Sequence, residues 1–365
     1  MKETHKKHPP ADRLKASNYH RNEFGIYGTG CGKINEFVSY LQNQLSNFNC
    51  IFIDADHNRD NYQNFIQIEE KQIHISKSRS AHEQDKKLHT NAADLVFVNG
   101  NHYPAANQII VLNSEKEASL KRRIDQLDSV FAIIIEENEE EIFPFLKEKI
   151  DDSTRIIKHK NKAELVEAIR VKVQIPELKA LILAGGKSMR MGFDKTTISY
   201  NGKSQALYIQ DLCEELGLDT YISKGHEYKG EDKNVIKDRL VEMGPMGGVI
   251  SAFMKDRNSA WLVIASDMPF VNKQSIQKLI SERNISEFAT SYSLSKDAFP
   301  EPTFAIYEPK IYKRILEFLS LGYTCPRKVL INSDIEKIVV SDKDILRNIN
   351  TEEEKDQALI DLNTK

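Results

Sequence analysis

The chain alternates short apolar runs rich in isoleucine and valine with longer amphipathic stretches. Short apolar runs bounded by turn residues are typical of buried strands, whereas apolar residues spaced three and four apart are typical of helices. Strands that alternate with helices form parallel sheets covered by helices, so we predict an α/β fold. The predicted elements are strands in 49–56, 93–100, 107–113, 129–137, 179–186, 219–223 and 260–269, and helices in 33–47, 205–217 and 273–284.

Two domains are expected, because one hydrophobic core seldom organises 365 residues. The stretch 160–173 has the pattern of a closing amphipathic helix, Pro176 interrupts it, and a new strand begins near Lys179. We therefore predict a flexible N-terminus over 1–20, a first α/β domain over 21–175 and a second over 176–365.

Charge and composition argue against several classes of protein. A net charge of -3 gives no general attraction to nucleic acid or to an anionic membrane. No run reaches the roughly 18 apolar residues of a membrane span, and the basic N-terminus lacks the apolar core of a secretory signal. The cysteines form no CxxC pair, which argues against structural zinc and a disulfide framework. We expect a cytoplasmic protein that binds neither nucleic acid nor membrane.

In the stretch 181–195, "LILAGGKSMRMGFDK", the end of an apolar strand is followed directly by glycines and positively charged residues. Gly185 and Gly186 would let backbone N–H groups approach a ligand closely, because no Cβ intervenes. Ligands of open parallel sheets bind beyond the carboxyl ends of the strands, where these glycines lie. Arg190 and Lys195 could neutralise phosphate oxygens. The alternative is a glycine turn with solvated basic residues.

Two aspartates are further candidate binding residues at the same edge of the sheet. Asp267 ends the apolar run of "VIASDMPF" (263–270), a position suited to Mg²⁺, although it could instead cap the next helix. Asp238 precedes the Gly-Pro and Gly-Gly of "KDRLVEMGPMGGVISAF" (237–253), where a helix is expected to begin near Gly247. That helix N-terminus could face an anion, or the segment could be a plain turn.

Together these segments resemble the molybdenum cofactor guanylyltransferase family, over about residues 178–362. The resemblance implies a doubly wound α/β fold of the nucleotide-diphospho-sugar transferase type. It also implies transfer of GMP from GTP to molybdopterin with release of pyrophosphate, supported by Mg²⁺. The matching segments are 183–195, 244–252, 266–270, 299–309 and 348–354.

Carried over residue by residue, the resemblance assigns a role to each matching position. Arg190, Lys195 and Asp267 would be catalytic, with Asp267 on Mg²⁺ and both basic residues on the triphosphate. The GTP site would consist of Leu183, Ala184, Gly185, Gly186, Lys195, Asp238 and Asp267. The chain departs from the family pattern at Lys187, at Ser266 where cysteine is common, and near Ser223 and Lys224, where no ribose contact can be assigned.

Electrostatics and positioning would dominate such a reaction, because the attacking phosphate is already an anion and needs no strong base. His226, the nearest candidate for acid–base work, reads instead as a surface loop residue. A cytidylyl- or sugar-nucleotide transferase of the same fold is one rival interpretation. A non-catalytic cofactor chaperone is another. Besides GTP and molybdopterin, a molybdoenzyme or a cofactor chaperone is a candidate partner.

The first half begins with "FGIYGTGCGKINEF" (24–37), which has the outline of a strand, a phosphate loop and a helix. Aligned on the Gly-Lys pair of a Walker A loop, Tyr27 replaces the first glycine and Ile34 replaces the Ser/Thr that reaches Mg²⁺. The remaining glycines and lysine still predict an anion-binding nest at Gly28, Gly30, Gly32 and Lys33.

This half resembles the P-loop adaptor that accompanies the guanylyltransferase, over about residues 22–150, with "IDADH" (53–57) and "DLVFVNGNH" (94–102) at the later strands. The two losses in the loop favour a retained fold without nucleotide turnover. Asp54, Asp56 and His57 could suggest a metal cluster, but carboxylates at strand ends more often cap the next element.

Overall fold

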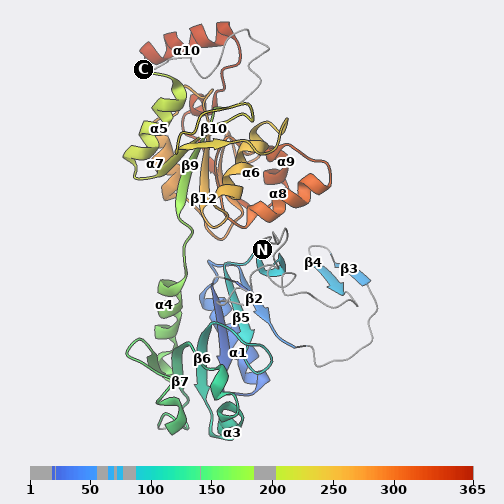
Figure 1. Ribbon diagram of the computed structural model, residues 1–365, viewed down its shortest axis with the longest axis vertical. Coiled ribbons are helices and arrows are strands. Elements are labelled where there is room, and N and C mark those ends of the chain that lie inside the picture. The colour runs from blue at the N-terminus through green and yellow to red at the C-terminus, as the bar shows by residue number, and fades with distance from the viewer. Residues whose placement is uncertain are drawn as a thin grey trace, which may run out of the picture. The chain divides into compact units, whose positions relative to one another are not determined.

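The computed structural model describes residues 19–20, 22–55, 65–69, 72–76, 88–139, 141–184 and 203–364. The chain divides into two compact units, Met1–Gln174 and Ile175–Lys365. Each contains its own sheet, drawn in blue to green for the first unit and in green to red for the second (Figure 1).

The first unit is built on a six-stranded sheet in the order β2-β5-β1-β6-β7-β8, and every neighbouring pair is parallel. The predicted α/β class is therefore confirmed for this half. A separate antiparallel hairpin, β3–β4, was not predicted. The strands are β1 (Glu23–Tyr27), β2 (Cys50–Ile53), β3 (Phe65–Glu69), β4 (Gln72–Ser76), β5 (Leu95–Asn99), β6 (Asn107–Leu112), β7 (Val130–Ile135) and β8 (Arg155–Lys158).

Helices cover both faces of this sheet because its strands are apolar on both sides. Phe24 and Ile26 of β1 lie in the core formed with α1 (Cys31–Gln44) and α4 (Lys162–Lys172). Tyr27 points to the opposite face, where it packs near α3 (Glu117–Lys121) and the segment that follows it. Continuous burial along β1, β5 and β6 is what a parallel sheet covered on two faces requires.

The second unit contains a seven-stranded sheet in the order β11-β10-β9-β12-β14-β13-β15. Its first four strands are parallel, as expected for the predicted doubly wound fold, whereas β14 runs antiparallel to both neighbours, which was not predicted. The strands are β9 (Leu178–Leu183), β10 (Asp219–Lys224), β11 (Val235–Lys237), β12 (Ala260–Ala265), β13 (Ala289–Ser293), β14 (Phe304–Tyr307) and β15 (Ile335–Val339).

Helices α5 and α7 cover one face of this sheet and α6, α8 and α9 cover the other, which gives a doubly wound sandwich (Figure 1). Alternate residues of β9 enter the two cores, Ile182 on the α5 side and Leu181 on the α6 side. Among the described residues, none of the helices is long and apolar enough to cross a membrane. The helices are α5 (Gln205–Glu215), α6 (Pro245–Lys255), α7 (Lys273–Ser281), α8 (Ile311–Ser320), α9 (Pro326–Ile331) and α10 (Glu352–Thr364).

An ion pair deep in the second unit joins the end of α7 to β14. Both guanidinium edges of Arg283 contact the carboxylate of Glu308, with Nε–Oε1 at 2.6 Å and Nη2–Oε2 at 2.9 Å. The Glu308 side chain is only 1% exposed and that of Arg283 is 11% exposed. Arg283 also donates to the carbonyl of Pro176, at the start of the unit. Each charge is therefore buried together with its partner.

Candidate active site

The carboxyl ends of β9, β10 and β12 meet at one edge of the second sheet. In the register of the parallel ladder, Leu183 lies beside Ser223 on one side and beside Ala265 on the other. Segments that leave these three strands therefore start from neighbouring points, which is why binding sites of open α/β sheets form there.

The start of the predicted glycine loop is fixed on both sides. The backbone N–H and the hydroxyl of Ser266 both donate to the Leu183 carbonyl, at 3.1 and 3.0 Å. The Ala184 N–H donates to the Ser223 carbonyl at 3.3 Å. Ser266, where the family commonly has cysteine, thus has a structural role. Leu183 and Ala184 are buried at the site, whereas Gly185, Gly186, Lys187, Arg190 and Lys195 lie outside the described residues.

Asp238 is held against the end of β10. Its backbone N–H donates to the Lys224 carbonyl at 2.8 Å, and the Ser223 hydroxyl donates to its Oδ1 at 2.7 Å. Burial raises the pKa of the Asp238 carboxyl, and the hydrogen bond from Ser223 partly offsets that rise. The Ser223 hydroxyl therefore binds the Asp238 carboxylate, and a ribose contact is still not assigned to it. His226 is exposed and its Nδ1 lies 3.3 Å from the Asp238 carbonyl, which agrees with its reading as a surface loop residue.

The turn before α6 brings that helix close to the strands. α6 begins at Pro245, two residues earlier than the predicted start near Gly247. The chain adopts φ +52° at Gly244, a value that favours glycine. A Cβ on Gly248 would lie 2.7 Å from Leu183 Cδ2 and 2.8 Å from Ser223 Oγ, so the helix can pack here only without a side chain.

Asp267 occupies the turn after β12. Its carbonyl accepts from the N–H of Ile349, which lies in the predicted C-terminal signature segment 348–354. The next residue, Met268, accepts at its carbonyl from Gln205 Nε2 at 3.0 Å. The alternative that Asp267 caps the following helix is wrong, because α7 begins at Lys273 and Asn272 caps it.

The chemistry of the residues present fits a hard divalent cation. The Asp267 carboxylate carries oxygen atoms of the kind that such a cation binds, and its Oδ1 is buried at the edge of the sheet. Within the described ranges there is no group of three or more histidine, cysteine, aspartate or glutamate side chains that could hold a metal. Mg²⁺ bound to a nucleotide needs no such group, because it takes one or two carboxylates together with phosphate oxygens and water.

Sequence reasoning missed Gln205 and the support that Ser223 and Ser266 provide. Gln205 is 1% exposed and anchors the Met268 carbonyl from the first residue of α5. The sequence carries no signal for that contact, because it depends on how a helix and a distant turn pack. The contact between Ser223 and Asp238 could have been suspected. Ser223 lies near the end of β10 and Asp238 directly follows β11, and these two strands are neighbours in the sheet.

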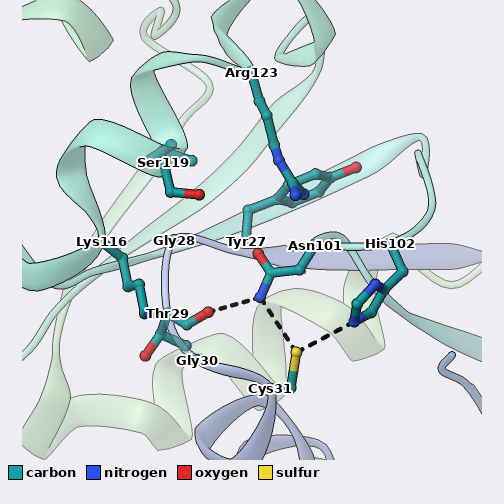
Figure 2. Close-up of a pocket in the computed structure, with 11 residues that line it drawn as sticks. Tyr27, Gly28, Thr29, Gly30, Cys31, Asn101, His102, Lys116, Ser119 and Arg123 are labelled. Carbon is teal, nitrogen blue, oxygen red and sulfur yellow. Dashed lines mark hydrogen bonds between the residues drawn. The ribbon is translucent and has the colours of Figure 1, made fainter. Parts of the chain in front are cut away.

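In the first unit, a cavity of about 200 Å³ lies where β1 meets α1 (Figure 2). Of the four residues predicted to bind an anion, Gly28 and Gly30 line it. Gly32 and Lys33 are exposed and are not among its lining residues. The described lining residues are Tyr27, Gly28, Thr29, Gly30, Cys31, Asn101, His102, Lys116, Ser119, Leu120 and Arg123.

The replacements in the predicted phosphate loop are part of the first unit's core. Tyr27 is 1% exposed, its hydroxyl accepts from the N–H of Ala105, and Ile34 is completely buried. Gly28 has φ +87°, and a Cβ there would lie 2.4 Å from the Val111 carbonyl oxygen. Asp54 accepts from Asn99 Nδ2 and from the N–H of Ala55, while Asp56 and His57 lie outside the described residues.

Comparison with known proteins identifies the second unit. Residues 180–335 match the model of the MobA-like NTP transferase domain. A molybdenum cofactor biosynthesis bifunctional protein from Synechocystis sp. is 32% identical over 53% of this chain, but only 58% of that protein's length is covered. A probable molybdenum cofactor guanylyltransferase from Methanocaldococcus jannaschii is 30% identical over 48% of this chain and 96% of its own length.

Among solved structures, molybdopterin-guanine dinucleotide biosynthesis protein A from Archaeoglobus fulgidus is 21% identical, with a TM-score of 0.41 over 51% of this chain and 100% of that one. The match to the family model and the near-complete coverage of the Methanocaldococcus relative establish the family of this half. The chain belongs to the molybdenum cofactor guanylyltransferase family.

Proposed function

We propose that the second unit transfers GMP from GTP to molybdopterin, forming molybdopterin guanine dinucleotide and releasing pyrophosphate. The observation that carries the proposal is the meeting of Leu183, Asp238 and Asp267 at one edge of a sheet whose sequence belongs to this family. The names of the relatives supply the two substrates.

The proposed reaction is a displacement at phosphorus. A terminal phosphate oxygen of molybdopterin forms a bond to the α-phosphorus of GTP, and the bond from that phosphorus to the β-phosphate oxygen breaks. The backbone around Leu183 and Ala184 positions the nucleotide, and Asp238 accepts a hydrogen bond from it. Arg190 and Lys195 oppose the charge that accumulates on the leaving pyrophosphate.

Asp267 would hold Mg²⁺. The cation would polarise the phosphates and reduce repulsion between the two anionic reactants. Ser266 and Gln205 keep the Asp267 turn in place, the first through Leu183 and the second through Met268. Ser266 and Gln205 would therefore act by positioning Asp267.

A turnover panel tests this proposal. The full chain is mixed with each of the four nucleoside triphosphates and Mg²⁺, with and without molybdopterin, and pyrophosphate release is followed. We expect release only with GTP and molybdopterin together. Equal or better use of CTP would assign the chain to the cytidylyl branch of the fold. Binding of molybdopterin without any release would identify a chaperone, the second rival, and a molybdoenzyme would then be sought as the acceptor.

We also propose that each unit folds on its own and that the first has lost nucleotide turnover. Support comes from the two compact units and from the buried Ile34, which stands where a Mg²⁺-binding hydroxyl would be needed.

Two experiments test these proposals. A fragment starting at residue 176 should be soluble and bind GTP; a folded fragment that cannot bind GTP contradicts the division. In calorimetric titration, wild type and Lys33→Ala should each bind one GTP per chain. Two sites in wild type and one in the variant would show a working P-loop.

A further inference from the structure

The cavity at the start of α1 holds a thiol–imidazole pair. The Cys31 Sγ lies 3.3 Å from the His102 Nε2, and both side chains line the cavity (Figure 2). The Asp54 Oδ1 lies 3.9 Å from the same nitrogen, so a carboxylate also stands beside the imidazole. Cys31 is also the first residue of a 14-residue helix, whose amide dipoles favour a negative charge at that end.

Two basic side chains line the same cavity. Lys116 and Arg123 both line it, and Figure 2 shows Lys116 reaching toward Thr29 and Gly30. Arg123 is anchored by a hydrogen bond from its Nη1 to the Gly100 carbonyl at 2.8 Å. No aspartate or glutamate is among the described residues that line the cavity. A small anionic molecule is therefore the ligand that this space favours.

The thiol is also open to attack by a small molecule. Cys31 is partly exposed, and a Cβ on either flanking glycine, Gly30 or Gly32, would meet no described atom within 4 Å. Two other cysteines differ sharply: burial raises the pKa of Cys50 and of Cys213 to about 12. Cys325 is exposed and serves as an internal reference thiol.

We propose that Cys31 is a reactive thiol that forms mixed disulfides with small disulfides carrying carboxylates. The Cys31 thiolate attacks one sulfur of the disulfide, a new S–S bond forms, and the old one breaks. The other half leaves as a thiolate, and the proton of Cys31 passes to His102 or to water. Lys116 and Arg123 attract the carboxylates. This site is separate from the guanylyltransferase reaction and does not depend on it.

The experiment uses the full chain and two probes, the anionic dithiobis(nitrobenzoate) and the uncharged hydroxyethyl disulfide. Mass spectrometry of peptides measures the rate of modification at Cys31 and at Cys325 in the same sample. We expect Cys31 to react about tenfold faster than Cys325 with the anionic probe, because His102 can take the thiol proton and Lys116 and Arg123 attract the carboxylates of the probe. Equal rates at the two cysteines would overturn the proposal.

Three variants separate the contributions. Lys116→Gln should slow the anionic probe at Cys31 about threefold, the effect of one charge roughly 6 Å away in water, and leave the neutral probe unchanged. Lys121→Gln, at the end of α3, which begins directly after Lys116, lies outside the cavity lining; it is the matched control and should change neither rate. His102→Gln should slow both probes at Cys31 alike. Circular dichroism reports whether each variant is folded, and the Cys325 rate, from the second unit, corrects for differences between samples. A folded His102→Gln chain with wild-type rates would refute the pairing.

Discussion

Replacing Gly248 by alanine tests whether α6 must lie directly against the edge of the sheet that we propose binds GTP. The added methyl group would approach Leu183 Cδ2 to 2.7 Å and Ser223 Oγ to 2.8 Å, whereas ordinary contacts are 3.4–4 Å. Leu183 can relax by moving the end of its side chain. Ser223 can relax only by rotating its hydroxyl away from Asp238, which then loses its 2.7 Å hydrogen bond.

The expected cost follows from three effects. Overpacking a buried site costs about 1–3 kcal/mol. Loss of the hydrogen bond to a carboxylate costs about 1.5 kcal/mol. Alanine is favoured over glycine in a helix by about 1 kcal/mol, which offsets part of this. We therefore expect Gly248→Ala to lower the free energy of unfolding of the second unit by about 2 kcal/mol and to weaken GTP binding.

A double-mutant cycle with Ser223→Ala identifies the cause. The single Ser223→Ala change should cost about 1.5 kcal/mol, but in the Gly248→Ala background it should cost almost nothing, because the hydroxyl has already left Asp238. The coupling energy should thus be about 1.5 kcal/mol. Trp261, the single tryptophan of the chain, is completely buried in β12, so its fluorescence in urea follows the unfolding of this unit.

Ser281→Ala is the matched control, because this exposed hydroxyl donates to the Lys278 carbonyl on its own helix and takes no part in the contact between Gly248 and Ser223. It should show no coupling to Gly248→Ala. If the Gly248→Ala and Ser223→Ala costs add to within about 0.5 kcal/mol, the methyl group does not displace the hydroxyl and the reasoning fails.

Three further changes test other parts of the second unit. Asp267→Asn should nearly abolish turnover at limiting Mg²⁺ while leaving the Trp261 unfolding curve in place; wild-type activity would show that the carboxylate holds no cation. Arg283→Met should lower the free energy of unfolding by about 3–5 kcal/mol because Glu308 is left buried and unpaired, and Arg283→Met with Glu308→Leu should recover most of it. Burial raises the folded pKa of Asp238 above 3.8, so the folded state retains a proton that the unfolded state releases, and stability falls as pH rises through that window. Asp238→Asn should flatten this fall in urea titrations at several pH values, and an unchanged slope would contradict the assignment.

Much of the fold was predictable because buried parallel strands carry continuous apolar sequence. The runs that became β6, β7, β9 and β12 contain four or more consecutive apolar residues, which few other structures accommodate. Strand direction was not predictable. β14 is buried along its whole length between β12 and β13, so its sequence is the same kind of apolar run whether it lies parallel or antiparallel. The hairpin β3–β4 did carry a signal, the alternation of isoleucine with polar residues in 65–69 and 72–76, but that signal is short.

The residues of the candidate site also divide into those that the sequence could predict and those that it could not. Asp267 could be predicted because it directly follows an apolar run, and strand ends of a parallel sheet gather at one edge. Asp238 could be placed near it for the same reason. Gln205 and Ser266 could not, because each acts on a backbone carbonyl that only the folded register brings within reach.

The aromatic ring of Tyr27 restricts which residues can stand near it. A Cβ on Gly25 would lie 2.7 Å from the ring, and one on Gly100 would lie 2.5 Å from it, so both positions now require glycine. Glycine at position 27, the residue of a Walker A loop, would leave a cavity where the ring lies and would leave the Ala105 N–H without the hydroxyl to which it donates. A change of Tyr27 towards a Walker A loop would therefore lower the stability of the first unit unless neighbouring residues changed with it.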